Sequence, residues 1–284
     1  MFLLSQFMIF DCIIYSNNYE DLILEIRLNT LDKFVDKFII VEATLDHSGR
    51  RKKLNFNINK FKKFKHKIRY IVVKDMPKNT KSFYYNGRKW HKNFVREEFQ
   101  RNQIMRGLYD IKDEDIIIIS DCDEIPNLNQ LKKVKIKKYA VFNQKFYKYK
   151  LNLLSVKQTP WQGSRVIIAK YLKKKITPQW LRQQYTKKIK FWQIHRYFTN
   201  PMIIENGGWH FSFAFSPKYI KTKMESFAHG ELKTKKTKDV NFLKEQIKNK
   251  RDIINGELLK KVKLDFSFPK FILKNKKKYS KLIL

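Results

Sequence analysis

The sequence predicts an α/β domain with a largely parallel central sheet, and three observations support this class. Apolar runs alternate with amphipathic segments along the first 125 residues, as in strands joined by helices. Several of these runs hold a continuous apolar stretch of four residues, such as 38–41 and 116–119, which is typical of strands covered by helices on both faces. Acidic residues stand where the runs end, and ligands of such sheets bind at the carboxyl ends of the strands.

The individual elements follow from this alternation. The strands expected in the first half are residues 6–15, 37–44, 68–77 and 115–126. The helices expected between them are residues 19–36 and 90–109, because their apolar residues recur at helical spacing. Further strand-like runs are residues 139–149, 164–171 and 190–198, and from about residue 218 the chain looks helical and Lys-rich. We find no repeat and no linker, so a single domain is expected over 1–284.

The composition excludes several classes of protein. Of the 284 residues, 43% are hydrophobic and 15% aromatic, which is too apolar for a disordered chain. With 8 Gly and 2 Cys, the chain is neither collagen-like nor framed by disulfides. The two thiols, Cys12 and Cys122, lie far apart in the sequence and favour a reducing compartment.

The charge is strongly positive. Sixty-two basic and 26 acidic residues give a net charge of +36, which permits binding to nucleic acid, anionic lipid or phosphorylated substrates. A compositional drift toward Lys, Asn and Ile gives the same excess without any function. The lysines are spread along the chain and no nucleic-acid module is recognisable, so we expect no dedicated nucleic-acid binding. Peripheral contact with an anionic membrane stays open.

The apolar N-terminus is interpreted as a strand rather than a targeting segment. It has no basic region before its apolar residues, and Asp11 interrupts it. No run in the chain reaches the ~18 apolar residues of a transmembrane helix. We therefore expect a cytoplasmic protein with neither signal peptide nor transmembrane helix.

The strongest chemical signal is the string IIIISDCDEIP at 116–126. Four isoleucines predict a buried strand, and Asp121 and Asp123 leave its end on the same side if the chain stays extended. Two hard oxygen ligands at that place suit Mn²⁺ or Mg²⁺, which would neutralise a diphosphate leaving group. The alternative is an acidic loop that only caps the strand.

This string resembles the motif of glycosyltransferase family 17, the β-1,4-mannosyl-glycoprotein 4-β-N-acetylglucosaminyltransferase family. Other segments resemble the family in the same order, from about residue 10 to 275: FDC (10–12), LEIRL (24–28), VEAT (41–44), WHKNFVREEFQRN (90–102), GGWHFSFAFSP (207–217), SFAHGE (226–231) and PKFILKN (269–275). The match is collinear over nearly the whole chain, and this collinearity is its most specific feature.

The resemblance implies a GT-A-like nucleotide-sugar-binding domain with a helical, Lys-rich C-terminal part. Its expected parts are a nucleotide-sugar-binding half (6–126), an acceptor and active-site half (127–230) and a basic helical segment (231–284). The metal ligands implied by the family motif are Asp121, Asp123 and His210. The residues implied for the nucleotide sugar are Asp11, Glu42, Arg96, Arg101, Asn102 and Trp209. Solvated helix charge, paired with neighbouring glutamates, is the alternative for the two arginines, and a packed aromatic corner is the alternative for Trp209 and His210.

The resemblance also implies the reaction, which is an inverting transfer of GlcNAc from UDP-GlcNAc to a glycan acceptor in β linkage. Such a displacement needs a general base. The candidates for this base are Glu124, Glu205, Glu225 and Glu231. We favour Glu205 because it precedes the Gly-Gly-Trp-His turn. Animal members carry a membrane anchor that this sequence lacks, so a microbial or viral-type enzyme is expected. Its acceptor would then be a lipid-linked or surface saccharide.

Two other functions compete with this reading. A haloacid-dehalogenase-type phosphatase also uses Asp-x-Asp after an apolar strand, but its motif usually lies in the first strand and is followed by Thr or Val. Here the motif follows residue 115 and precedes Glu124, Ile125 and Pro126. A non-catalytic basic protein that binds nucleic acid or membrane would explain the charge but not the acidic end of a buried strand.

Overall fold

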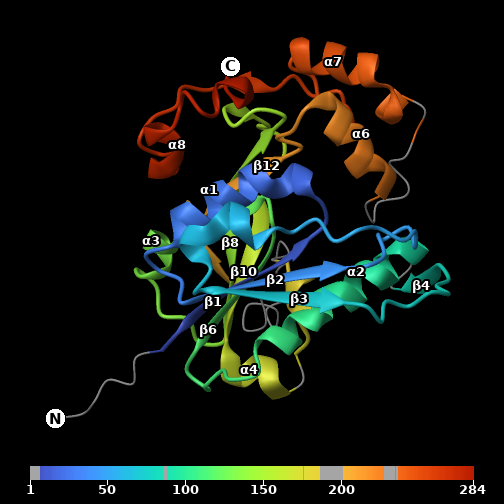
Figure 1. Cartoon of the computed structure of the whole chain (residues 1–284). Helices are drawn as coiled ribbons and strands as arrows, with labels where there is room; N and C mark the ends of the chain where they lie inside the picture. The colour runs from blue at the N-terminus through green and yellow to red at the C-terminus, as the bar shows by residue number, and fades with distance from the viewer. Residues whose placement is uncertain (1–6, 86–87, 175, 186–200, 227–233, 235) are drawn as a thin grey trace, which may run out of the picture.

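The computed structural model describes residues 7–85, 88–174, 176–185, 201–226, 234 and 236–284. A mixed β-sheet lies at its centre with helices on both faces (Figure 1), and its main path runs β13-β9-β8-β10-β6-β1-β2-β3. The strands of this path are β1 (Ile9–Tyr15), β2 (Lys37–Ala43), β3 (Ile68–Val73), β6 (Ile116–Asp121), β8 (Tyr139–Lys148), β9 (Leu153–Leu154), β10 (Trp161–Ile168) and β13 (Lys260–Lys261).

Shorter elements complete the fold. The strands β7 (Glu124–Pro126), β11 (Met202–Ile204) and β12 (Gly208–Ser212) join the same sheet, and β4 (Phe83–Tyr85) and β5 (Arg88–Trp90) form a separate pair. The α-helices are α1 (Asp21–Leu31), α2 (Lys92–Asn102), α3 (Leu128–Leu131), α4 (Ala169–Lys174), α5 (Pro178–Arg182), α6 (Pro217–Ser226), α7 (Val240–Lys248) and α8 (Lys270–Lys274). The 3₁₀ helices are η1 (Asn18–Glu20), η2 (Ile58–Phe64), η3 (Gln103–Gly107), η6 (Lys236–Lys238) and η7 (Ser280–Leu282).

The parallel half of the sheet carries the four strands that the apolar runs predict. The strands β3, β2, β1 and β6 are neighbours in this order and all run parallel. Ile13 of β1 lies between Ile40 of β2 and Ser120 of β6, so β1 is covered on both edges. The carboxyl ends of β1 and β6 therefore meet at one edge of the sheet, where Asp121 closes β6.

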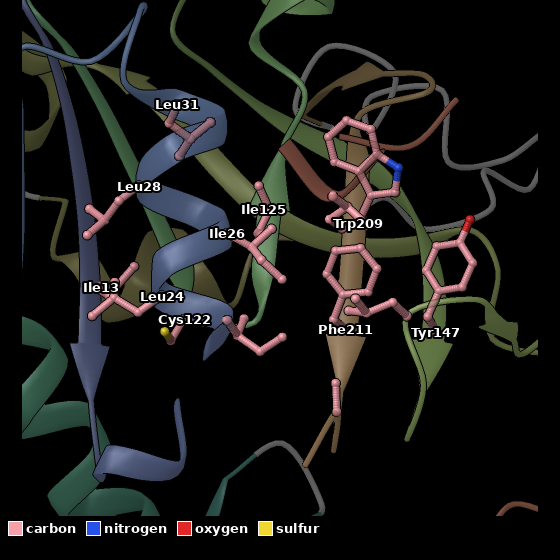
Figure 2. Packing of buried hydrophobic residues seen from close by; sticks show 14 of the residues in the cluster. Ile13, Leu24, Ile26, Leu28, Leu31, Cys122, Ile125, Tyr147, Trp209 and Phe211 are labelled. Carbon is pink, nitrogen blue, oxygen red and sulfur yellow. The ribbon is translucent and has the colours of Figure 1, made fainter. Parts of the chain in front are cut away.

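Alternation along these strands divides the buried side chains between two cores. On one face, Ile13, Ile40 and Ile118 pack with the apolar side of α1. Figure 2 shows Ile13 beside the leucines of α1, with Ile125 and the aromatic side chains of β12 and β8 farther along the same cluster. On the other face, Cys12 and Ile39 pack with side chains from η3, α4 and α5. Each fully buried Ile or Leu contributes roughly 1.5–3 kcal/mol, so both faces hold the strands.

The second half of the chain places a strand directly beside the acidic turn after β6. The strand β12 pairs in parallel with β8 and antiparallel with β7, so that His210 lies opposite Glu124. The strand β10 runs antiparallel between β6 and β8. This arrangement brings residues from the second half to the edge where β1 and β6 end.

The structure modifies several predicted elements. The first helix ends at Leu31 rather than at residue 36, and the helix predicted at 90–109 is α2 followed by the 3₁₀ helix η3. The run at 115–126 is two strands, because the chain turns between Asp121 and Glu124. The strand predicted at 190–198 lies outside the described residues.

The C-terminal part is Lys-rich, as expected, but its helices are short. Coil and the strand β13 separate α7 from α8, and Pro269, which has no N–H to donate, precedes α8. In the described part of the chain, no helix combines the length and the apolar character needed to cross a membrane.

Candidate functional site

A cavity of about 630 Å³ opens where β1 and β6 end. Ile14 and Asp121 line it from these two strands, and the segment 45–52 after β2 forms another part of its wall. His210 of β12 and Lys223 of α6 line the side contributed by the second half of the chain. Both predicted halves thus contribute to one cavity at the edge where ligands of parallel sheets bind.

Asp121 occupies the end of β6 and is held from behind by two arginines. Its Oδ1 accepts a hydrogen bond from Arg101 of α2 at 2.8 Å, and its Oδ2 accepts one from Arg182 of α5 at 2.9 Å. Burial opposes the charge on this carboxylate, but the two guanidinium groups outweigh it and hold the pKa of Asp121 well below its usual range. Asp121 is therefore ionised, with both oxygens paired.

Asp123 follows in the turn and faces the second half of the chain. Its Oδ2 accepts a hydrogen bond from Lys223 Nζ at 3.0 Å, and its Oδ1 lies 3.5 Å from His210 Nε2. Burial raises the pKa of Asp123, but Lys223 and His210 have the larger combined effect and lower it. Burial likewise works against the charge of Lys223, yet Asp123 and Glu20 raise its pKa, so the ammonium group stays charged.

Glu124 is fully buried directly beneath this turn. Its Oε1 accepts hydrogen bonds from Arg182 Nη2 at 2.6 Å and from the indole N–H of Trp161 at 2.8 Å, and its Oε2 accepts one from the backbone N–H of Asp121 at 3.2 Å. Each carboxylate oxygen is thus satisfied within the protein. Glu124 fixes the shape of the turn and the position of Arg182.

Arg27 of α1, which sequence reasoning missed, supports the turn from the other side. Its guanidinium group is buried, pairs with Asp11 through two hydrogen bonds at 2.5 and 2.7 Å, and donates to the carbonyls of Asp121 and Glu124. Asp11, predicted to contact the nucleotide, lies inside β1 instead of at its end and does not line the cavity. The structure gives Asp11 the role of fixing Arg27.

Glu42 and Arg96 also lie behind the cavity wall, in contrast to their predicted role. Glu42 is fully buried and accepts hydrogen bonds from the backbone N–H groups of Asn55 and Phe56 and from Tyr70. Arg96 donates to the backbone carbonyls of His47, Pro77 and Lys78. Glu42 fixes the course of the segment that follows β2, and Arg96 ties that segment to the one that follows β3.

Three further predicted residues stand apart from the cavity. Asn102 ends α2, where its side chain accepts a hydrogen bond from the backbone N–H of Gln179. Trp209 lines a second cavity of about 550 Å³ and donates to the carbonyl of Ser267. Glu205 is exposed and bonds to Asn143. Glu231 lies outside the described residues.

The aromatic wall of the cavity joins His210 to two residues, Phe146 and Trp161, that sequence reasoning did not single out. The rings of Trp161, Phe146 and His210 lie together, with centroids 4.3 to 5.2 Å apart. Glu20 also lines the cavity, and burial is the main reason why its pKa is raised to about 7. A Trp on a half-buried strand and an acidic residue at a helix start are too common in sequences to signal a site by themselves.

The sequence profile of glycosyltransferase family 17 matches residues 4–282. The chain belongs to this family. No curated protein matches the sequence. Similar solved structures include the galactosyltransferase LgtC in complex with donor and acceptor sugar analogues, at 12% identity and a TM-score of 0.33 over 69% of this chain and 72% of that chain. Another is the apo form of the glycosyltransferase GlyE of Streptococcus pneumoniae TIGR4, at 10% identity and a TM-score of 0.37 over 70% and 45%.

The match to the family 17 profile confirms the prediction that was made from the collinear motifs. The parallel strands β3, β2, β1 and β6, with the antiparallel β10 beside them, also confirm the predicted α/β class with a largely parallel central sheet. The Lys-rich C-terminal part with its short helices agrees with that description as well.

The divalent metal implied for family 17 can be tested against the side chains present. Asp121 and Asp123 reach the cavity together, as the motif predicts, and His210 adjoins Asp123. However, the carboxylate oxygens of both aspartates already face cationic or imidazole nitrogens of this chain. Within the described ranges, no three His, Cys, Asp or Glu side chains are grouped to hold a metal ion. This arrangement does not fit a resident Mn²⁺ or Mg²⁺ ion.

Proposed function

We propose that this family 17 glycosyltransferase moves GlcNAc from UDP-GlcNAc to a saccharide acceptor, with inversion to a β linkage. The observation that carries the proposal is the cavity at the ends of β1 and β6, which is lined by Asp121, Asp123 and Lys223. Its volume lies within the ~300–1,000 Å³ typical of cavities for small ligands. Its position matches the edge of a parallel sheet at which nucleotides bind.

The charge of the cavity wall supports an anionic donor. Arg50, Arg51 and Lys223 line the cavity from two different elements. Among the acidic residues that line the cavity, Asp121 and Asp123 are paired with cations, so they repel a diphosphate less than free carboxylates would. A diphosphate group can therefore approach this wall.

The aromatic group of Trp161, Phe146 and His210 supports a bound sugar. Sugar rings present apolar C–H faces, which pack against aromatic side chains, while their hydroxyl groups bond to polar neighbours. We propose that Trp161 takes the role that the sequence suggests for Trp209. The indole of Trp161 is fixed in place by its hydrogen bond to Glu124.

An inverting transfer needs one displacement and one base. The acceptor hydroxyl oxygen bonds to the anomeric carbon, the bond to the diphosphate oxygen breaks, and the hydroxyl proton passes to a carboxylate. Both oxygens of Glu124 are already engaged, and Glu205 does not line the cavity. Glu20 and Glu225 line it, and we propose these two as the bases to test. The pKa of Glu20, near 7, suits a base that works at neutral pH.

The acceptor, the location and the membrane contact of the protein remain predictions from the sequence. We predict a glycan or lipid-linked saccharide acceptor, a cytoplasmic location, and peripheral contact of the basic surface with an anionic membrane. The phosphatase alternative is not favoured, because its nucleophile would be Asp121, and both oxygens of Asp121 are held by Arg101 and Arg182.

The direct test is calorimetric titration of the full chain with UDP-GlcNAc, UDP-galactose and GDP-mannose, in buffer that contains Mn²⁺ so that a metal requirement cannot hide binding. Ser16 lines the cavity, and Ser16→Trp fills part of it. We expect UDP-GlcNAc to bind most tightly and Ser16→Trp to weaken it by at least about tenfold. The matched control is Ser280→Trp, at an exposed position of η7, which should leave the affinity within about twofold.

The outcomes separate the parts of the proposal. Tighter binding of UDP-galactose than of UDP-GlcNAc would overturn the choice of donor sugar. Absence of binding of every nucleotide sugar to the wild-type chain would overturn the proposed function. Release of UDP that depends on an added saccharide, with a β-anomeric signal in the product, supports the transfer itself.

A further inference from the structure

The side chain of Lys223 occupies the place in the cavity where a metal ion would be expected. Its ammonium nitrogen lies 3.0 Å from Asp123 Oδ2 and 5.3 Å from the ring centroids of both Phe213 and Phe215. Only 17% of the side chain is exposed. A carboxylate and two aromatic faces thus hold a fixed positive charge beside the acidic turn.

We propose that Lys223 supplies the cation that meets the donor diphosphate, so that this chain binds its nucleotide sugar without a divalent metal. The proposal rests on the proposed function, because it concerns how the same cavity holds the donor. It departs from the metal dependence that the Asp-x-Asp motif suggests.

The surroundings of the two aspartates support this assignment. A divalent ion coordinates carboxylate oxygens directly, at about 2.0–2.2 Å, and would have to displace the groups that now contact them. For Asp121 these groups are Arg101 and Arg182, and for Asp123 they are Lys223 and His210. The ion would also be repelled by three permanently charged groups nearby. The neutralising charge is already part of the protein.

The chemistry of a lysine suits this task. An ammonium group is a compact positive charge with three N–H donors, and Lys223 presents it at the cavity wall beside Asp123. Lysine also binds phosphate as a point charge in other nucleotide sites. Arg50 and Arg51 line the same cavity from the segment after β2 and add positive charge at its wall.

The test compares binding of UDP with and without a metal, using calorimetry on the full chain in EDTA and in Mn²⁺. For the wild type, we expect affinities that agree within about threefold in the two buffers. Lys223→Met keeps the length of the side chain but removes its charge, and should weaken UDP binding in EDTA by at least about tenfold. Lys223→Arg should restore part of that loss.

A matched control lies on the same helix. Lys218 is exposed and does not line the cavity, so Lys218→Met removes the same charge from α6 without touching the site and should change affinity by less than about twofold. Circular dichroism of Lys223→Met checks that it is folded. Paramagnetic resonance of Mn²⁺ without nucleotide gives an independent readout, and the wild type should leave the free-ion signal unchanged.

The possible results distinguish this proposal from the proposed function. Binding of UDP by the wild type only when Mn²⁺ is present, or loss of the free Mn²⁺ signal, would overturn the role of Lys223 and leave the glycosyltransferase assignment intact. If folded Lys223→Met binds UDP with the affinity of the wild type, the role of Lys223 is overturned as well. Absence of UDP binding in both buffers would instead remove the proposed function and this inference with it.

Discussion

The buried pair of Arg27 and Asp11 offers the sharpest test of how the acidic turn is held. Their side chains are 0% and 1% exposed, and Arg27 also donates to the carbonyls of Asp121 and Glu124. Arg27→Met leaves the Asp11 carboxylate buried without its cation. Removing one partner of a buried pair costs about 3–5 kcal/mol, which is a large part of the ~5–15 kcal/mol that stabilises a domain.

The assay is urea unfolding followed by tryptophan fluorescence and circular dichroism. The matched control is Arg106→Met, because Arg106 and Asp75 form a similar two-bonded pair whose side chains are 42% and 55% exposed. This exposed pair should contribute no more than about 1 kcal/mol. Arg27→Met should therefore lower the free energy of unfolding at least about threefold more than Arg106→Met does.

A second variant separates the unpaired charge from lost packing. In Arg27→Met/Asp11→Leu no buried carboxylate is left without a partner, so the double variant should be more stable than Arg27→Met by about 1–2 kcal/mol. Equal losses in Arg27→Met and Arg106→Met would refute the reasoning, as would a double variant that is less stable than the single one.

Three other predictions concern the cavity and its frame. Burial raises the pKa of Glu20 to about 7 in the folded chain, above its unfolded value, so the folded state binds more protons between these two values. The free energy of unfolding should therefore fall as the pH rises from about 4.5 to 7. In thermal unfolding measured at several pH values, Glu20→Gln should make this decrease smaller. Gly208 has a φ of +129°, and in Gly208→Ala the new Cβ would lie 2.1 Å from a backbone carbonyl oxygen. Gly256 has a φ of +72°, but open space surrounds it. Gly208→Ala should therefore lower the free energy of unfolding at least twice as much as Gly256→Ala does. Glu124→Gln should cost about 2–4 kcal/mol in chemical unfolding, since Arg182 and the Trp161 indole lose their shared carboxylate, and a loss below about 0.5 kcal/mol would contradict this.

The sequence predicted the parallel half of the fold because its strands are continuous apolar runs, and such runs are stable only when both faces are buried. It also identified the end of β6, since Asp121 and Asp123 interrupt the most apolar run in the chain. It assigned Asp11 to the nucleotide site, although the strand predicted at 6–15 already has Asp11 in its middle, as β1 does. What the sequence did not show is that Arg27 of α1 would pair with Asp11 inside the fold.

The pair Trp209 and His210 illustrates a second limit. Adjacent residues of a strand point to opposite faces, and both lie in β12, so only one of them can face the cavity. His210 does, and Trp209 lines the second cavity instead. Recognising 208–212 as a strand would have separated them from the sequence alone.

The cations of the site could not be predicted in the same way. Arg182 lies 61 positions from Asp121, and Lys223 lies 100 positions from Asp123, among many other lysines. Nothing in their local sequence distinguishes them from solvated surface charge. Their role depends on how β12, α5 and α6 pack around β6, which is a property of the whole fold.

Hydrogen–deuterium exchange with and without UDP-GlcNAc tests the central claim most directly, because it reports where the nucleotide sugar binds. We predict slower exchange in peptides that cover 14–20 and 45–52, which line the cavity at the ends of β1 and β6. Peptides that cover 266–271, at the second cavity, should not change. Protection confined to 266–271, or no protection at saturating UDP-GlcNAc, would contradict the placement of the donor site.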